Sequence, residues 1–389
     1  MAYSAVWSPV ARNGAEHTME DTMPFSYCMP TRVIAGPGCL VEQGEALKSL
    51  GTKALIVTGA RSARASGALD DAVRALTDCG LPYAVYDKVM SNPTVQCAYD
   101  GADMARANGC DFMLAIGGGS PLDAAKAMAL LAASDAPPDP EAVFGASFTK
   151  ALPVAAVPTT AGTGSEVTQY AILANDAAET KTSIATPLIF PRLAFLDGAY
   201  MRGLGRGVTV NTAIDALSHA VEGMLSVRAS VISDTLARQS LAMIAPRLEA
   251  AGAGALDAGD RDELLLASTL AGMVIANTGT TAVHAMGYSL TYYKNVDHGR
   301  ANGLLLPQFL MFVERSEPGR VADILACMGL ASTAAFAALM ASLLGKRERL
   351  SPEEYTLYAD KASKAANIAN SIVRPERDDL LGMLRAALG

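Results

Sequence analysis

The side chains best suited to chemistry are the histidines, of which the 389 residues contain only four: His17, His219, His284 and His298. Asp215 and His219 are four residues apart, so on a helix both project from one face. One carboxylate and three imidazoles suit Fe²⁺ or Zn²⁺, and ligand type alone does not choose between them. A metal with one open position could act as a Lewis acid on a carbonyl or alkoxide oxygen. A single histidine is more often a core or surface residue, but this combination favours a metal site.

A glycine-rich turn lies between an apolar run and a helical pattern, in DFMLAI-GGGS-PLDAAKAMALLAA. Gly117, Gly118, Gly119 and Ser120 let backbone amides approach a phosphate, and a helix N-terminus adds a favourable dipole. Pro121 is expected at the first helical position, where its missing N–H costs nothing. The turn is neither GxGxxG nor a Walker loop, so it predicts a pyrophosphate site without naming the nucleotide. The alternative is a turn that is merely tight.

A second polar segment, PTTAGTGSEVT, follows the apolar run PVAAV. Its hydroxyls and free amides come from Thr159, Thr160, Thr163, Gly164 and Ser165. The alternative is a Ser/Thr-rich turn that caps the next element. Ligands of open α/β sheets bind at the carboxyl ends of the strands, so the two loops are expected at one site.

The elements that must position these groups fall into two halves. Up to about residue 200, short apolar runs alternate with helical patterns, which predicts a parallel sheet covered on both faces. The strands are expected at 53–58, 83–87, 111–116, 153–157 and 193–197, and the helices near 62–79, 95–109 and 121–133. Beyond residue 203 we expect only helices, at 211–226, 231–248, 261–276, 301–313, 320–344, 351–367 and 375–388, with a loop at 250–260.

This pattern divides the chain into three parts. Residues 1–22 are expected to be a flexible tail, with Met19 or Met23 as an alternative start. Residues 23–203 are expected to form a dinucleotide-binding α/β domain. Residues 204–389 are expected to form a helical metal-binding and catalytic domain.

Composition limits the classes of function. Hydrophobic residues make up 51% and charged residues 18%, so the chain can bury large cores. A net charge of −8 without a basic run argues against nucleic-acid and membrane partners. Six cysteines without a CxxC pair are typical of a reduced, cytoplasmic protein. The one membrane-length apolar run, 264–286, contains several hydroxyls and has no flanking Lys/Arg asymmetry, which predicts a buried helix followed by a break.

Taken together, the motifs resemble those of the iron-containing (group III) alcohol dehydrogenases. GGGSPLDAAKA, PTTAGTGSEVT, DALSHAVEG and HAMGYSL…DHGRANGLLLP occur in that family's order, and the resemblance runs from about Pro30 to the C-terminus. It implies a dehydroquinate synthase-like fold, with an α/β Rossmann-like N-terminal domain and an all-α C-terminal metal-binding domain. It also implies the ligands of a divalent metal, usually iron and sometimes zinc: Asp215, His219, His284 and His298.

The resemblance further implies a set of cofactor-binding residues. Gly118, Gly119 and Ser120 would hold the pyrophosphate, and the rest of the cleft would be lined by Gly59, Asn92, Asp123, Thr159, Thr160, Thr163 and Lys181. Many members have an acidic residue just after the first dinucleotide strand, where this chain has Gly59 followed by Arg61 and Arg64. Loss of the carboxylate and gain of a guanidinium favour NADP(H) over NAD(H). The alternative is that both arginines are solvated at a helix start.

Tyr288 occupies a position where some relatives have a further histidine, four residues after the third ligand. We count it among the candidate catalytic residues. A phenol with an ordinary pKa of about 10 is a poor proton shuttle at neutral pH. Proton exchange is then expected through the cofactor ribose or a water molecule.

The implied activity is reversible hydride transfer between a nicotinamide and a small primary alcohol or aldehyde. Two alternatives on the same scaffold are a 2-oxoacid-linked transhydrogenase and a reductase of carboxylate- or phosphonate-bearing aldehydes. Lys294 and Arg300, near the last ligand, could attract such an anion or could be surface charges. Relatives are commonly dimers or larger, so a homo-oligomer is expected.

Overall fold

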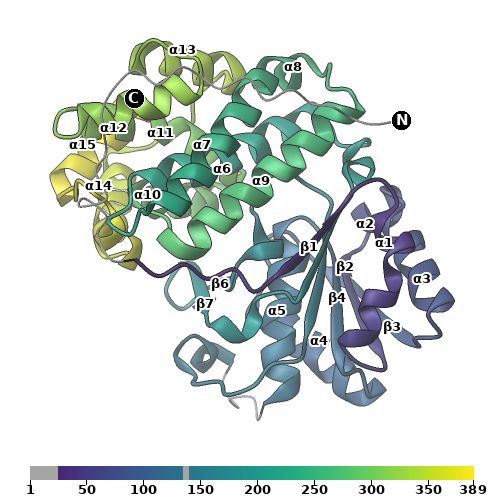
Figure 1. The fold of residues 1–389 in the computed structure, drawn as a ribbon. Helices are drawn as coiled ribbons and strands as arrows, with labels where there is room; N and C mark the ends of the chain where they lie inside the picture. The colour runs from purple at the N-terminus through teal and green to yellow at the C-terminus, as the bar shows by residue number, and fades with distance from the viewer. Residues whose placement is uncertain (1–24, 135–139) are drawn as a thin grey trace, which may run out of the picture.

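The computed structural model describes residues 25–134 and 140–389, so the predicted tail at 1–22 lies outside the described residues. Figure 1 shows a half that contains a sheet, coloured purple to teal, against a half of helices in green and yellow. The predicted fold class, a Rossmann-like α/β part followed by an all-helical part, is confirmed.

The main sheet has six parallel strands in the order β1-β8-β5-β4-β2-β3. Its strands are β1 (Arg32–Ala35), β2 (Ala54–Gly59), β3 (Tyr83–Val89), β4 (Phe112–Gly117), β5 (Val154–Pro158) and β8 (Leu193–Leu196). All five strands expected from apolar runs are present. β1 was not predicted, because this short edge strand is partly exposed and has no continuous apolar run.

Helices cover both faces of this sheet, as the buried strands require. They are α1 (Cys39–Glu42), α2 (Ser62–Ala65), α3 (Ala68–Asp78), α4 (Val95–Asn108) and α5 (Gly119–Ala133). In Figure 1, α4 and α5 lie on one side of the strands and α1 and α3 on the other. Successive residues of β2 therefore enter different cores: Leu55 packs with the α4 and α5 side, and Ile56 with the α1 and α3 side. The helix expected at 62–79 is divided by Gly67, which adopts a positive φ of 84°.

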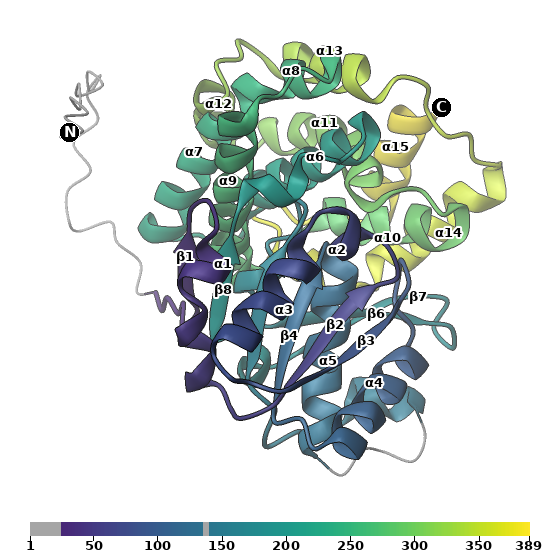
Figure 2. The same cartoon turned by 90° about the vertical axis from the view of Figure 1, so that its right-hand side faces the viewer.

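A second, antiparallel sheet of two strands was not predicted. It is a hairpin of β6 (Tyr170–Asn175) and β7 (Thr180–Ala185). Its residues are mixed in polarity and only alternate positions of β6 are buried, so it lacks the apolar run that marked the other strands. The hairpin contacts α5 and, across the junction of the two halves, α10 (Ala282–Lys294), as seen in Figure 2.

The second half consists of helices around one core. Besides α10, they are α6 (Arg206–Met224), α7 (Val231–Ile244), α8 (Leu248–Ala253), α9 (Ala258–Thr278), α11 (His298–Glu314), α12 (Pro318–Cys327), α13 (Thr333–Leu344), α14 (Pro352–Ser363) and α15 (Arg377–Leu388). The division predicted between 203 and 204 falls just before α6. The loop expected at 250–260 is shorter, because α8 extends to Ala253 and α9 begins at Ala258. The helix expected at 320–344 is divided into α12 and α13.

α10 was not predicted as a separate helix, because its start continues the apolar run at 264–286. The structure ends α9 at Thr278, and Gly279 then adopts a positive φ of 68°. The break expected in this run is therefore present. In the described part of the chain no single helix is long and apolar enough to cross a membrane; α9 and α10 pass that test only as a pair bent by 109°.

α6 lies at the centre of the helical half and contacts α7, α9 and α11. Nearly all of its residues from Thr209 to Met224 are buried. α11 approaches it closely through Gly299, since a Cβ there would lie 3.0 Å from the Cβ of Asp215 and would collide with the carbonyl oxygen of Asn211. This contact brings the start of α11 against the middle of α6.

Candidate metal centre and cofactor cleft

The four predicted ligands converge in the helical half. The Nε2 atoms of His219 and His284 are 3.0 Å apart. Oδ1 of Asp215 lies 4.0, 3.9 and 3.8 Å from Nε2 of His219, His284 and His298, respectively. Asp215, His219 and His284 are almost fully buried, and His298 is partly exposed.

These separations fit a tetrahedral metal site. Four ligands at about 2.1 Å from a metal have donor atoms about 3.4 Å from one another. The observed distances, from 3.0 to 4.0 Å, lie on both sides of that value. Two imidazole lone pairs 3.0 Å apart also need a cation or a proton between them. The donor set therefore suits Fe²⁺ or Zn²⁺.

Three helices position the four side chains. Asp215 and His219 lie one turn apart on α6, as their spacing predicts. His284 lies in the first turn of α10, and His298 is the first residue of α11. The close contact at Gly299 places His298 beside Asp215.

Glu222 is a functional residue that the sequence reasoning missed. This carboxylate is fully buried, and its Oε2 accepts a short hydrogen bond from Nδ1 of His284. Its Oε1 accepts from the backbone N and the Oγ1 of Thr281, at 2.8 and 2.7 Å. A proton held on Nδ1 leaves the Nε2 lone pair of His284 free for a metal. The signal was available, because Glu222 follows Asp215 and His219 at seven and three residues on one helix face.

The electrostatics of the cluster favour the ligand forms of these groups. Burial lowers the pKa of His298 to about 3, although Asp215 opposes this change. Burial also lowers the pKa of His219. For Asp215, burial acts to raise the pKa, but the three neighbouring imidazoles outweigh it and leave the pKa lowered. His284 is the exception: burial acts to lower its pKa, and Glu222 outweighs burial and raises it.

Two further side chains border the cluster. Nδ2 of Asn302, on α11, lies 3.0 Å from Asp215 Oδ1, 3.2 Å from His284 Nε2 and 3.3 Å from His298 Nε2. Sequence reasoning missed this residue, which follows His298 by one helical turn. Tyr288 stacks on His298 with ring centroids 5.8 Å apart. Burial, with the charges of Glu222 and Asp215, raises the pKa of Tyr288, so its hydroxyl keeps its proton at neutral pH.

The glycine-rich turn lies at the end of β4, as expected. Gly117 adopts a φ of 149°, and a Cβ there would lie 2.6 Å from Cγ of Pro121. Gly118 caps α5, which begins at Gly119. Pro121 is thus the third helical residue and not the first, but it still lies in the turn whose N–H groups have no helical partner.

The two predicted loops meet at this end of the sheet. The backbone N of Thr159 donates to the carbonyl of Gly117 at 2.9 Å. A Cβ on Gly118 would lie 3.1 Å from Oγ1 of Thr160, and one on Gly119 would lie 2.7 Å from Cγ2 of Thr163. Only glycine leaves this space between the loops.

Asn92 and Gly59 lie at the same edge of the sheet. The backbone N of Asn92, which has a positive φ of 56°, donates to Oγ of Ser120 at 3.3 Å. Gly59 ends β2, the neighbour of β4. The chain runs from β2 outward to β3 and then returns to β4, so strand order reverses between β2 and β4, where open α/β sheets bind nucleotides.

Both carboxylate oxygens of Asp123 accept hydrogen bonds from within the protein. Its Oδ1 accepts from Oγ of Ser165 at 2.5 Å, and its Oδ2 accepts from the backbone N of Ile172 at 3.2 Å. Lys181, on β7, is partly exposed and lies near the charges of both Asp123 and Asp215. Burial lowers its pKa to about 8. With a pKa of about 8, Lys181 is mainly cationic at pH 7.

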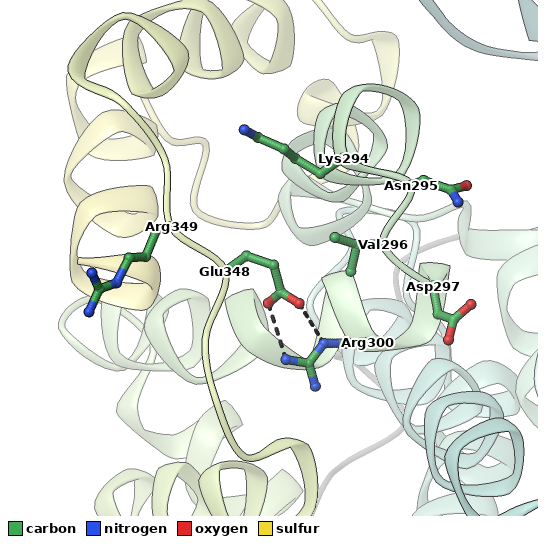
Figure 3. A pocket seen from close by; sticks show the side chains of 7 residues that line it. All are labelled: Lys294, Asn295, Val296, Asp297, Arg300, Glu348 and Arg349. Atoms are coloured by element: carbon green, nitrogen blue, oxygen red, sulfur yellow. Dashed lines mark hydrogen bonds and ion pairs between the residues drawn. The ribbon is translucent and has the colours of Figure 1, made fainter.

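The basic residues considered for anion binding differ in their partners. Arg61 and Arg64, just beyond β2, are exposed and have no ion pair among the described residues. Lys294 pairs with Glu354 at 2.5 Å, and Arg300 pairs with Glu348 at 2.7 Å. Figure 3 shows Arg300 and Glu348 joined across a surface pocket of about 410 Å³. The positive charges of Lys294 and Arg300 are thus already neutralised.

Comparison with known proteins gives consistent matches along the chain. A family model described as iron-containing alcohol dehydrogenase matches residues 30–198, and one for the C-terminal part of the Fe-containing family matches 209–388. A lactaldehyde reductase of Escherichia coli is 34% identical over 280 residues, 72% of each chain. A sulfoacetaldehyde reductase of Bilophila wadsworthia is 31% identical over 386 residues, 94% of this chain and 99% of the relative. An iron-containing alcohol dehydrogenase structure from Thermotoga maritima is 36% identical with a TM-score of 0.87, over 94% of this chain and 100% of that one.

Proposed function

The chain belongs to the iron-containing alcohol dehydrogenase family, and we propose that it transfers hydride between NAD(P) and a small primary alcohol or aldehyde. The observation that carries this proposal is the cluster of one carboxylate and three imidazoles. The packing of Gly162, in the second loop, against Thr212 of α6 supports a nucleotide bound next to that cluster.

We infer that Asp215, His219, His284 and His298 hold Fe²⁺, with Zn²⁺ as the alternative. Such a metal supplies a Lewis acid that stabilises developing alkoxide character on the substrate oxygen. Glu222 keeps His284 in the tautomer that can bind it.

The nucleotide loops are proposed to act by orientation. The amides of Gly118, Gly119 and Ser120, at the start of α5, would hold the pyrophosphate and so fix the position of the nicotinamide. We further propose a preference for NADP(H). Its support is that Arg61 and Arg64 are exposed and unpaired among the described residues, beyond a strand that ends in glycine.

For the substrate we propose a neutral short-chain aldehyde first. An anionic aldehyde is the second candidate, favoured by the similarity to a sulfoacetaldehyde reductase along nearly the whole chain. Because Lys294 and Arg300 are paired with carboxylates, another cation would have to hold the anion, and we propose Lys181, whose charge interacts with Asp123 and Asp215. A 2-oxoacid-linked transhydrogenase would be distinguished by cofactor retained after purification.

The test is oxidation of NADPH and of NADH with a panel of neutral and anionic aldehydes, by Fe²⁺-reconstituted and by chelator-treated protein. We expect metal-dependent oxidation, faster with NADPH. Faster oxidation of NADH would overturn the cofactor preference alone. No oxidation with any aldehyde, in protein that holds metal, would overturn the proposed activity.

We also propose that the protein acts in the cytoplasm as a homo-oligomer. The thiols support the first point, because all six cysteines are free. The second is supported by exposed apolar side chains near the start of α7, namely Val227, Val231 and Ile232. Light scattering of the purified chain measures its mass, and a monomer would contradict the second point.

A further inference from the structure

Lys126 is a buried cation that the proposed reaction does not use. It lies on α5 and its side chain is fully buried. Nζ donates to Oγ of Ser165 at 2.7 Å, to Oγ1 of Thr168 at 3.2 Å and to the carbonyl of Tyr170 at 2.9 Å. A buried ammonium is costly unless all of its hydrogens are bonded, and here all three are. The charge is therefore retained in this position with a complete set of partners.

These partners all belong to the segment 159–170, which follows β5 and leads into β6. Asp123, one turn before Lys126 on α5, completes the attachment, because its Oδ1 is 3.9 Å from Nζ and accepts from Ser165. The glycine-rich turn that opens α5 is thus tied to the second loop through the interior of the domain. Burial lowers the pKa of Lys126 to about 8, so the ammonium form still predominates at pH 7.

The second loop, within the segment 159–170, contacts two parts of the molecule. One is the glycine-rich turn, which faces Thr160 and Thr163. The other is the helical half: a Cβ on Gly162 would lie 2.8 Å from Cβ of Thr212, on the turn of α6 that precedes Asp215. The short helix η4 (Ser165–Val167) adds a bond to α9, where Oγ1 of Thr269 donates to Oε1 of the buried Glu166 at 2.7 Å.

Nδ1 of His219, a proposed metal ligand on α6, is buried and has no hydrogen-bond partner in the described structure. The second loop packs against the same helix, because Gly162 lies close to Thr212. A displaced loop would therefore remove a contact from the helix that carries Asp215 and His219.

We propose that Lys126 is a positioning residue that holds loop 159–168 in the one arrangement that serves both the cofactor and the metal. The inference rests on the proposed function, because the nucleotide and the metal are the two ligands that the proposed function requires. In the native protein the loop is already ordered, so neither ligand has to order it for the other. Without Lys126 the loop is ordered only part of the time, and each ligand binds more weakly by the inverse of the ordered fraction.

Without Lys126, the affinities for the nucleotide and the metal should follow a specific pattern. If the loop is ordered in roughly one tenth of the molecules, each ligand alone binds about tenfold more weakly. A saturating amount of either ligand then orders the loop and restores the affinity for the other. Cooperativity absent from the native protein thus appears in the variant. A residue that only stabilised the fold would lower the melting temperature without producing this coupling.

The experiment uses Lys126→Met in the full chain. NADPH binding is measured by nucleotide fluorescence on metal-free protein, and Zn²⁺ binding by competition with a chelating indicator, each with and without the other ligand at saturation. We expect equal losses of roughly tenfold for the two ligands alone, recovery to within about twofold of the native values with both, and less than about twofold coupling in the native protein. Unequal losses, or losses that the second ligand does not reverse, would overturn the proposal.

Two further variants keep the result interpretable. Met128→Ala changes a buried side chain on the same helix that packs toward α4 at Gly101, so it should lower stability and leave both affinities unchanged. If Lys126→Met does not fold, Thr168→Val removes one of its three acceptors with little change of shape, and the same pattern should appear at about threefold. If the native protein binds NADPH and Zn²⁺ but neither ligand changes the affinity for the other in Lys126→Met or Thr168→Val, this proposal alone is overturned. Native protein that binds neither ligand would overturn the proposed function as well.

Discussion

The candidate metal cluster and the proposed nucleotide loops would bind their ligands with different parts of the chain. The cluster is made of side chains from three helices, and Asp215, His219 and His284 are only 3%, 4% and 2% exposed. The nucleotide loops offer backbone amides and hydroxyls at the ends of parallel strands, around Gly118 and Gly119. The first site is set by a few side chains, and the second by the path of the backbone.

This difference predicts how each site responds to substitution. Removing one side chain from a four-ligand site removes a quarter of its donors, and the described part of the chain contains no histidine besides the three of the cluster. A backbone amide cannot be removed by substitution, so the phosphate site weakens only when a new side chain obstructs it. Effects should therefore be largest at the cluster and smaller at the loops.

The largest effect is expected from His284→Ala. It removes a ligand and leaves the Glu222 carboxylate buried without its partner, so the metal should be lost. We expect kcat/KM to fall on the order of 10³-fold or more, because a Lewis acid supplies several kcal/mol of stabilisation. Metal content, steady-state kinetics and NADPH fluorescence measure the three consequences, and NADPH binding should survive. Chelator-treated native protein is the control; substantial turnover in the metal-free variant would refute a role for the metal.

Glu222→Gln should have the next largest effect. Glu222 uses both carboxylate oxygens, one for Thr281 and one for His284, and an amide has only one oxygen. If its NH₂ group turns to His284, the imidazole must carry its proton on Nε2, where it cannot bind a metal. We expect metal affinity to fall roughly 10–100-fold, as for other residues that orient metal-bound histidines.

Metal affinity in this variant is measured by chelator competition. Glu249→Gln, on the exposed surface of α8, is the matched control and should bind metal normally. Native affinity in Glu222→Gln would mean that the charge of Glu222 does not help to hold the metal.

A smaller effect is expected at the nucleotide loops from Gly118→Ala. Its φ and ψ of −76° and −164° suit alanine, so the fold should persist. The added methyl would lie 3.1 Å from Oγ1 of Thr160, in the space through which the amides reach a phosphate. We expect the KM for NAD(P)H to rise about tenfold, the loss of one charge-assisted hydrogen bond, with metal content unchanged. Gly382→Ala, whose Cβ would meet nothing within 4 Å, is the control, and a loss of metal without a change in KM would contradict the division between the two sites.

The same difference explains what could be predicted from the sequence. Strand–glycine–helix order is local, so the turn at 117–120 and its place at a strand end were predictable. The candidate ligands were found because histidine is rare in this chain and because Asp215 and His219 share a helix face. The same rarity suggested that His284 and His298 belong to the site, although nothing local joins them to α6, and the resemblance to a family then implied all four as ligands of one metal.

The residues that were missed act across long separations in sequence. Glu222 meets Thr281 and His284 from 59 and 62 residues away, and Lys126 meets Ser165 from 39. Such contacts depend on how elements pack, and in the sequence a buried lysine such as Lys126 looks like a solvated one. For Glu222 the one local signal was its place on the helix face of Asp215 and His219. Asp123 remains a predicted cofactor contact, and what the sequence did not indicate is that its two oxygens also accept hydrogen bonds from Ser165 and Ile172.

The smallest effect is expected from Tyr288→Phe, which tests whether the phenol belongs functionally to the cluster. Burial, together with Glu222 and Asp215, raises the pKa of Tyr288, so the hydroxyl stays protonated across the pH range 6 to 9 and gives no titration there. Phenylalanine keeps the stacking on His298. We expect kcat to change by less than about threefold and the pH profile of kcat/KM to keep its shape, because the phenol does not change its protonation state in this range. Steady-state kinetics from pH 6 to 9 with native protein in parallel provide the check. A loss of tenfold or more, or an altered alkaline limb, would make Tyr288 a proton donor.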